Sequence, residues 1–364
     1  MTLEQIAGAA LMVLFLADVF LTVLYARAGT GLLAPGWNRC VWVLFKALAG
    51  LFGRERTTIL SFAGPVIVIC LIAFWALGLS VGAALVIQPE LGTAIRPSSG
   101  SASTDFVTAL LVAGNSLSIV GGGDYSPHTS GMRLLFLLNS LIGASVLSLV
   151  LSYLVQVYSA LRERNVLAMT VHQLTGEAGD AAEMLARLGP DGDFSNATSE
   201  LSNLVRSLVM TKEAHHFYPL LFYFRFSDPL YSVSRFSFVL LDLTALIGTT
   251  LDQQMYGTFV RSAPVGALQR SALLLLKTLD RHFPAQSDVH AAVNPGSYAV
   301  AAETLQRAGI SVRPNIQAYD DRRRRWEPLV RSVAPTMGYD MDEIDCRRAS
   351  HEVATPSRVK AWDR

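Results

Sequence analysis

Apolar residues are concentrated in the first 161 positions of the chain, in long runs without formal charge. Residues 57–89 and 134–161 contain no Asp, Glu, Lys or Arg. A third apolar run, residues 6–26, is interrupted only by Asp18 and ends at Arg27. Each run contains at least the ~20 residues that a helix needs to cross a bilayer. The pattern predicts three membrane-spanning helices, and the first is too long and too weakly basic at its start for a cleaved signal.

A shorter apolar segment, residues 41–52, is broken by Lys46. Tryptophans lie near its start and arginines follow its end, namely Trp37, Trp42, Arg54 and Arg56. This arrangement is typical of a helix that lies in the membrane interface. A tilted span is the alternative interpretation.

Residues 106–117 form an apolar stretch of helical character that begins after Ser103 and Asp105. A dozen residues make a helix of about 18 Å, roughly half of the membrane. Such a helix should enter the membrane and stop there. Residues 118–124 must then return as extended backbone, which is tolerated at that depth only inside protein or along a watery path.

The composition agrees with a membrane protein that carries a separate polar half. Of 364 residues, 51% are hydrophobic and 16% charged, with a net charge of +1. The polar half, from about residue 162 onward, is long enough to bury a core of its own. Cys40, Cys70 and Cys346 lack metal-ligand spacing, and we expect them to be reduced.

Positive charge predicts the orientation of the chain in the membrane. Basic residues gather after the first span, at Arg27, Arg39, Lys46, Arg54 and Arg56, and again after the last span, at Arg162 and Arg164. Both regions should therefore be cytoplasmic. We expect a multi-pass protein of the cell membrane, with its amino terminus outside, residues 88–133 on the outer side and its carboxyl-terminal half in the cytoplasm.

The returning segment reads Ile119-Val120-Gly121-Gly122-Gly123-Asp124, and Pro127 follows. If several chains present stacked rings of carbonyl oxygens to an ion, alternate residues must adopt left-handed backbone angles. Glycine adopts these angles at little cost, so Gly121 and Gly123 suit this role. The alternative is a loose extracellular loop, where glycine triplets are common.

This order of elements resembles the pore of the potassium-channel-like superfamily, whose filter reads Thr-Val-Gly-Tyr-Gly-Asp. The resemblance covers roughly residues 60–160 and implies a selectivity filter at Ser118, Ile119, Val120, Gly121, Gly122, Gly123 and Asp124. It implies permeant monovalent cations at Val120, Gly121 and Gly122, a homotetramer, and a hinge glycine of the inner helix at Gly143.

Departures from the family pattern bear on ion selectivity. Ile119 replaces a threonine whose hydroxyl contributes an ion site, and Gly122 replaces the aromatic residue that braces the filter. Leu111 and Val112 stand where the family often has tryptophans, and Asn115 stands where many members have an acidic residue. The filter should be softer and have fewer sites, which leaves potassium-selective and non-selective conduction both open.

The last span supplies candidates for the inner pore wall, at Ser140, Gly143, Ala144, Leu147 and Leu151. Leu147 and Leu151 suit a hydrophobic constriction. A hinge at Gly143 and simple close packing of small residues are alternatives. Asp18, inside the first span, is either functional or paired with a residue such as Arg39 or Lys46.

From residue 163 onward the periodicity predicts a helical domain. Leu201, Leu204, Val205, Leu208 and Val209 follow the spacing of a one-sided helix. Further helices are expected near 166–188, 229–249, 266–282, 297–308 and 322–333. His215 and His216 lack a third spaced metal ligand, and core packing explains them better. The run Arg322–Arg325 suits either anionic lipid or a salt-bridged helix face.

The sequence thus predicts an all-α membrane protein, with an amino-terminal and interfacial part (1–57), a pore domain (58–162) and a cytoplasmic regulatory domain (163–364). The predicted function is passive cation conduction through a tetrameric pore, without a cofactor, nucleic-acid partner or enzymatic activity. The cytoplasmic domain should have a ligand or protein partner of unknown kind. The alternative function is a non-conducting membrane anchor that displays a sensor or docking domain.

Overall fold

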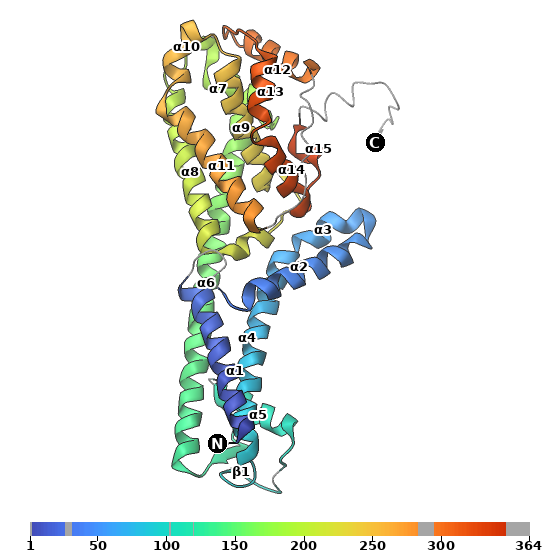
Figure 1. Ribbon diagram of the computed structural model, residues 1–364, viewed down its shortest axis with the longest axis vertical. Coiled ribbons are helices and arrows are strands. Elements are labelled where there is room, and N and C mark those ends of the chain that lie inside the picture. Colours follow the sequence, from blue (N-terminus) through green and yellow to red (C-terminus); the bar gives the residue numbers. More distant parts are fainter. Residues whose placement is uncertain (1, 26–30, 102, 119, 283–294, 347–364) are drawn as a thin grey trace, which may run out of the picture. The chain divides into compact units, whose positions relative to one another are not determined.

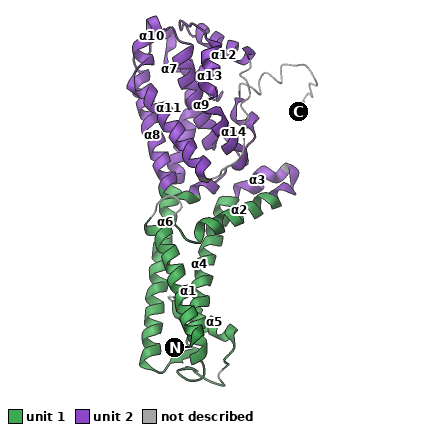
Figure 2. Ribbon diagram, viewed as in Figure 1, with its two compact units in different colours: residues 1–48, 63–159, 217–220 green, residues 49–62, 160–216, 221–364 purple. Residues whose placement is uncertain are grey.

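The computed structural model describes residues 2–25, 31–101, 103–118, 120–282 and 295–346, and most of them form helices (Figure 1). Two compact units divide the chain (Figure 2). Unit 1 comprises residues 1–48, 63–159 and 217–220, and unit 2 comprises residues 49–62, 160–216 and 221–364. The division into three functional parts that the sequence predicts, with boundaries at 57/58 and 162/163, stays a prediction.

Three helices are, among the described residues, long and apolar enough to cross a membrane; the first two lie in unit 1, and the third begins there and continues beyond residue 159 into unit 2. They are α1 (Leu3–Val19) extended by the π-helical turn η1 (Phe20–Leu24), α4 (Ala63–Ile87) extended by η3 (Gln88–Glu90), and α6 (Ser130–Leu174). The three predicted spans are therefore confirmed as helices of sufficient length. α2 (Ala34–Gly50) is not among them, and the interfacial and tilted-span interpretations of this segment stay predictions.

Small residues allow α1 to lie directly along α4 (Figure 1). Gly78 and Gly82, one helical turn apart on α4, face Phe15 and Met12 of α1 so closely that added methyl groups would overlap them. Gly8 of α1 in turn approaches the Gly82 carbonyl oxygen. Small residues four apart commonly provide this close backbone approach in membranes, where apolar burial gives little drive for helix association.

Asp18 is fully buried, with 0% of its side chain exposed, and joins three helices of unit 1. Its Oδ1 accepts hydrogen bonds from the backbone N–H groups of Leu33 (2.7 Å) and Ala34 (3.2 Å) at the start of α2. Its Oδ2 accepts one from Trp75 Nε1 on α4 at 2.7 Å. These bonds account for the buried carboxylate in place of a partner such as Arg39 or Lys46, which the sequence suggested, because a helix amino terminus offers free N–H donors.

Unit 2 is a helical bundle around α9 (Val233–Thr249), in which every residue except Arg235 is buried. Around it lie α7 (Ala181–Leu188), α11 (Ala263–His282), α13 (Ile316–Arg323), α14 (Glu327–Thr336) and α15 (Met341–Ile344). The unit also contains α3 (Arg56–Ser61), α8 (Ala197–Phe217), α10 (Gln253–Val260) and α12 (Pro295–Arg307), with short 3₁₀ turns between them.

Local chemistry moves several helix boundaries from those expected. The predicted helix at 166–188 is two helices, because Gly176, Glu177 and Gly179 adopt positive φ between α6 and α7. The helix predicted from 229 begins at Val233, since Pro229–Tyr231 form a 3₁₀ turn. The helix predicted at 322–333 is divided into α13 and α14.

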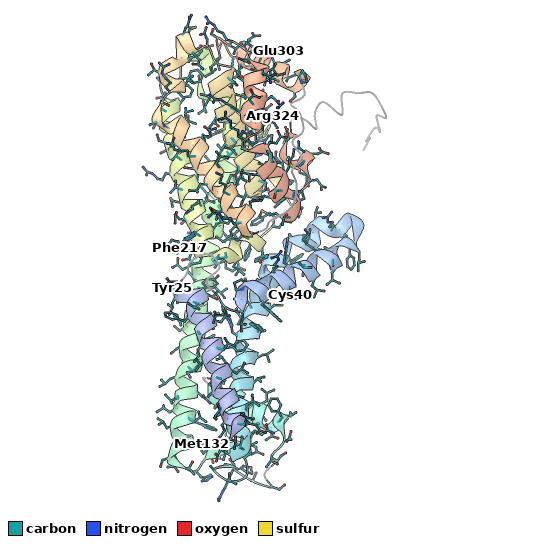
Figure 3. All side chains as sticks on the ribbon, viewed as in Figure 1. Tyr25, Cys40, Met132, Phe217, Glu303 and Arg324 are labelled. Carbon is teal, nitrogen blue, oxygen red and sulfur yellow. The ribbon has the colours of Figure 1, made fainter. Side chains whose placement is uncertain are left out.

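A buried ionic cluster lies beside α9. Arg323, 5% exposed, contacts Glu327 (3.2 Å), Asp345 (3.2 Å) and Asp242 (3.8 Å). Burial alone disfavours the guanidinium charge, but Tyr319 and the three carboxylates raise the pKa of Arg323 well above its ordinary value. Arg324, labelled in Figure 3, pairs with Asp320. These pairs favour the salt-bridged interpretation of the Arg322–Arg325 run.

Two further buried arginines fix residues 221–226 within unit 2. Arg164, in the last part of α6, donates to the carbonyl oxygens of Leu221 (3.1 Å) and Phe224 (2.9 Å). Arg225 donates to the carbonyl oxygens of Thr57 (2.9 Å) and Gly338 (3.1 Å). The loop at residues 221–226 is therefore bound to the last part of α6, to α3 and to the turn before α15.

Removing the indole donor to Asp18 should destabilise unit 1. We expect Trp75→Phe to lower the free energy of unfolding by about 1–3 kcal/mol, because one oxygen of a buried carboxylate loses its partner. Thermal unfolding in detergent would measure the effect.

Trp37→Phe is the matched control. Trp37 stacks on Phe74 with ring centroids 4.5 Å apart, and its buried Nε1 makes no hydrogen bond. Equal losses in the two variants would contradict the assigned role of the Asp18–Trp75 bond.

Candidate functional site

The predicted half-length helix is present as α5 (Phe106–Leu117) and is capped by Asp105. The Asp105 carboxylate accepts hydrogen bonds from Val107 N–H (3.1 Å), Thr108 N–H (3.2 Å) and the Thr108 hydroxyl (2.6 Å). Hydrogen bonds from Ser103 and then Thr108 lower the pKa of Asp105 to about 2. Asp105 is therefore charged at neutral pH and complements the helix amino terminus.

The buried face of α5 packs into the apolar core of unit 1. Ala109, Val112 and Ala113 meet α1 and α4 residues such as Met12 and Ala83. Met132, which Figure 3 labels in the first turn of α6, packs against the same cluster. Leu111 lies on the other side of α5 and is 55% exposed. Of the two support positions where the family often has tryptophans, only Val112 therefore faces inward in this chain.

The chain leaves α5 at Ser118, whose N–H donates to the Gly114 carbonyl at 2.9 Å. The Ser118 hydroxyl accepts a hydrogen bond from Val120 N–H at 3.2 Å, and Ile119 lies outside the described residues. Val120 is 92% exposed, and residues 121–124 are exposed as well. Gly121 adopts φ +70°, a left-handed conformation that side chains disfavour.

The expected alternation of left-handed residues is wrong at Gly123, which does not adopt a left-handed φ. The physical reason is that glycine permits the left-handed conformation but does not impose it. The Ser98 hydroxyl donates to the Gly123 carbonyl oxygen, and Ser98 N–H donates to the Asp124 carbonyl at 2.8 Å. The exit of the returning segment is therefore bonded to Ser98.

Asn115 supports the returning segment by contact with Gly122. An added methyl group at Gly122 would overlap the Asn115 side-chain amide. Asn115, which stands where many family members have an acidic residue, thus lies beside Gly122. The absence of a side chain at Gly122 thus allows the backbone to lie against α5.

A cavity of about 380 Å³ lies behind the returning segment, within unit 1. Its walls include Val112 and Asn115 of α5, Phe136 and Ser140 of α6, and the backbone of Gly121–Gly123. Ser116, Ser118 and Ser126 also border it.

Asn139 was not among the residues singled out by sequence, yet it joins α5 to α6. It is 1% exposed, and its Nδ2 donates to Ser116 Oγ at 2.9 Å. The Ser116 hydroxyl in turn donates a hydrogen bond to the Ala113 carbonyl at 2.8 Å. An amide inside an uncharged apolar run is the sequence signal that identifies such a position, since a polar group there needs a partner.

Gly143 is a point of close packing. A methyl group added at Gly143 would overlap the Leu117 carbonyl oxygen at the end of α5. Gly143 and Leu147 also border a second cavity of about 250 Å³, with Trp75 of α4 and Leu117. α6 passes through this position as one helix. The packing interpretation of Gly143 therefore has direct geometric support.

The remaining inner-wall candidates occupy one side of α6. Ser140 borders the first cavity, while Ala144, Leu147 and Leu151 are exposed in the single chain. Leu147 and Leu151 are 46% and 55% exposed. The structure therefore places these side chains on an open face of the helix, available to solvent, lipid or another chain.

Comparison with known proteins identifies the segment that contains this site. Residues 57–160 match the family described as Ion channel, of the two-transmembrane potassium-channel-like type. These residues belong to that family. They comprise most of α3, all of α4 and α5, and the first part of α6. No curated protein and no solved structure matches the chain significantly.

The family match and the three apolar helices together make this a membrane protein with an ion-channel segment. α1, α2 and nearly all of unit 2 lie outside the matched residues. Within the described parts of the chain, no group of three or more His, Cys, Asp or Glu side chains is arranged to hold a metal ion. His215 is buried, and its Nδ1 lies 2.8 Å from the Thr211 carbonyl.

Substituting Gly143 should distinguish a packing role of this glycine from a role as a hinge. We expect Gly143→Ala to lower the free energy of unfolding by about 1–3 kcal/mol, because the methyl group forces apart the α5 end and α6. Thermal unfolding in detergent would measure this loss. Unchanged stability with an altered open probability would instead support a hinge.

Proposed function

We propose that the protein is a passive cation channel, formed by a homotetramer, in which residues 118–124 make the selectivity filter. The observation that carries the proposal is Gly121. It adopts φ +70° in an exposed segment that follows a half-length helix, inside residues that match an ion-channel family. The carbonyl groups of Val120, Gly121 and Gly122 would replace the hydration shell of a monovalent cation.

The half-length helix supports cation conduction electrostatically. The carboxyl end of a helix carries partial negative charge, and α5 ends directly before the returning segment. α5 is fixed in place by its Asp105 cap, its apolar core and the Ser116–Asn139 hydrogen bond. A fixed dipole favours a cation without reorganisation when the ion arrives.

The exposure of the returning segment supports assembly of several chains. A ring of carbonyls around an ion needs contributions from more than one copy, and closed rotational symmetry provides them. Val120 is 92% exposed in the single chain, and Leu111 on α5 is more than half exposed. Leu147 and Leu151 would then face the pore axis as a hydrophobic constriction.

Ion selectivity is the finer part of the proposal. Potassium is the ion implied by the family resemblance, and non-selective conduction of monovalent cations is the alternative. The Gly123 carbonyl oxygen accepts a hydrogen bond from the Ser98 hydroxyl, so it does not add a fourth ring to the three carbonyls proposed to bind ions. The unfilled cavity behind Gly122 allows the remaining carbonyls to move. Both features favour weaker discrimination between ions.

We further propose a position in the cell membrane with the amino terminus outside and unit 2 in the cytoplasm, as the distribution of basic residues predicts. Unit 2 would then regulate the pore in response to a ligand or protein partner. Its buried arginine contacts with α3 and with the extension of α6 support this role.

Conduction depends, in this proposal, on the left-handed conformation of Gly121. We expect Gly121→Ala to abolish current while the tetramer still assembles. An alanine methyl at position 121 meets no atom within 4 Å, so the effect comes from backbone strain, about 1–2 kcal/mol per residue. Purified protein in planar bilayers, with size analysis of the assembly, would test this.

Gly131→Ala is the matched control, because Gly131 also has open space around it and has no positive φ. We expect this variant to conduct as the natural protein does. If the protein assembles but carries no current in any condition, and Gly121→Ala leaves every cellular activity intact, the non-conducting anchor replaces the channel.

The reversal potential under a potassium–sodium gradient identifies the conducted ion. We expect a clear current that reverses between zero and the potassium potential, because the loosened filter discriminates incompletely. Reversal at the potassium potential would show that the carbonyl geometry is stiff despite the changes at positions 119 and 122.

A further inference from the structure

The returning segment lacks side chains with which to hold its own backbone. Between Ser118 and Asp124 the described residues are Val120, 92% exposed, and three glycines. Hydrogen bonding at its start comes from Ser118, and packing at its middle comes from Asn115 against Gly122. A segment of this kind needs a further attachment at its exit, because glycine loses more conformational freedom on ordering than other residues.

The exit is attached to a short β-ribbon. Strand β2 (Tyr125–Pro127) follows the returning segment directly and pairs antiparallel with β1 (Ile95–Pro97). The register places Pro97 opposite Tyr125 and Ile95 opposite Pro127. Beyond the ribbon, His128 N–H donates to the Ala94 carbonyl at 2.8 Å.

Ser98 continues this ribbon onto the glycines. Its N–H donates to the Asp124 carbonyl at 2.8 Å, and its hydroxyl donates to the Gly123 carbonyl oxygen. The first bond is a backbone bond that any residue except proline could make. The second depends on the serine side chain.

The ribbon is in turn fixed to the outer helix. Ile95 is 0% exposed and belongs to the apolar cluster of Ile87 and Leu91 with Ala109 of α5. Gly92 N–H donates to the Ile95 carbonyl at 2.8 Å, which closes the turn after η3. A continuous chain of hydrogen bonds and apolar contacts therefore connects Gly123 to the end of α4.

We infer that Ser98 is a positioning residue for the filter, which holds the Gly123 carbonyl and ties the filter exit to α4 through the β1–β2 ribbon. This inference rests on the proposed channel function and adds a named residue to it. The ribbon supplies a restraint at the place where Gly122 and Val112 leave a cavity behind the filter.

Ser98→Ala tests the inference, with Ser99→Ala as the matched control and Ser98→Thr as the variant that keeps the hydroxyl. Both serines are exposed, so neither substitution disturbs the core. Hydrogen exchange of the peptide covering residues 120–124 would be measured in the full-length assembled protein. We expect exchange about fivefold faster in Ser98→Ala, the effect of losing one hydrogen bond on local opening.

Single-channel recording supplies the functional readout. We expect the ratio of brief closed to open time to rise about fivefold in Ser98→Ala and to return to the natural value in Ser98→Thr. Ser99→Ala should be unchanged in both measurements.

The two measurements separate failure of the inference from failure of the proposed function. Equal exchange in Ser98→Ala and Ser99→Ala overturns the role of Ser98, whether or not the protein conducts. Absence of current from the natural protein counts against the channel, while faster exchange in Ser98→Ala still supports the attachment of Gly123 to the ribbon.

Discussion

The structure of unit 1 depends on the need of backbone polar groups for partners inside an apolar environment. α5 is about half as long as a membrane span, and the chain returns from its carboxyl end without helical hydrogen bonds. Such backbone is stable at membrane depth only when protein groups or water supply the missing partners. Ser118 and Ser98 meet this need at the start and the exit of the returning segment, and Asn115 packs against Gly122 between them.

The same requirement explains the polar residues buried in the helices. Asp18 takes up the free N–H groups at the start of α2 and the Trp75 indole, and Asn139 bonds Ser116 on α5. Other helix contacts lack hydrogen bonds and depend on small residues that let the backbones pack closely. These are Gly78 and Gly82 against α1, and Gly143 against Leu117. α5 and the returning segment are therefore held by two kinds of short-range contact, hydrogen bonds and direct backbone approach.

Unit 2 is stabilised differently, by a large apolar core with a few charged side chains inside it. Arg323 is surrounded by three carboxylates and aromatic rings, and Arg164 and Arg225 bind carbonyl oxygens. Arginine suits these positions because its planar guanidinium presents several donors in a fixed geometry. The loop at residues 221–226 is consequently held to α3 and to the last part of α6. α3 directly precedes α4 in the chain, and the last part of α6 directly follows the apolar part of the same helix.

The sequence by itself determined the three long apolar helices, the half-length helix at 106–117 and the helical character of the second half. These features follow from local composition and periodicity, which determine what a segment can bury. Tertiary structure decided the partners of Asp18, the contact of Asn115 with Gly122, the close approach at Gly143 and the bond from Ser98 to Gly123. Each of these joins residues on different elements, and a periodicity carries no information about which elements meet. The glycines at 121–123 show the difference most clearly, since their sequence permits several backbone conformations and only Gly121 of the three adopts a positive φ.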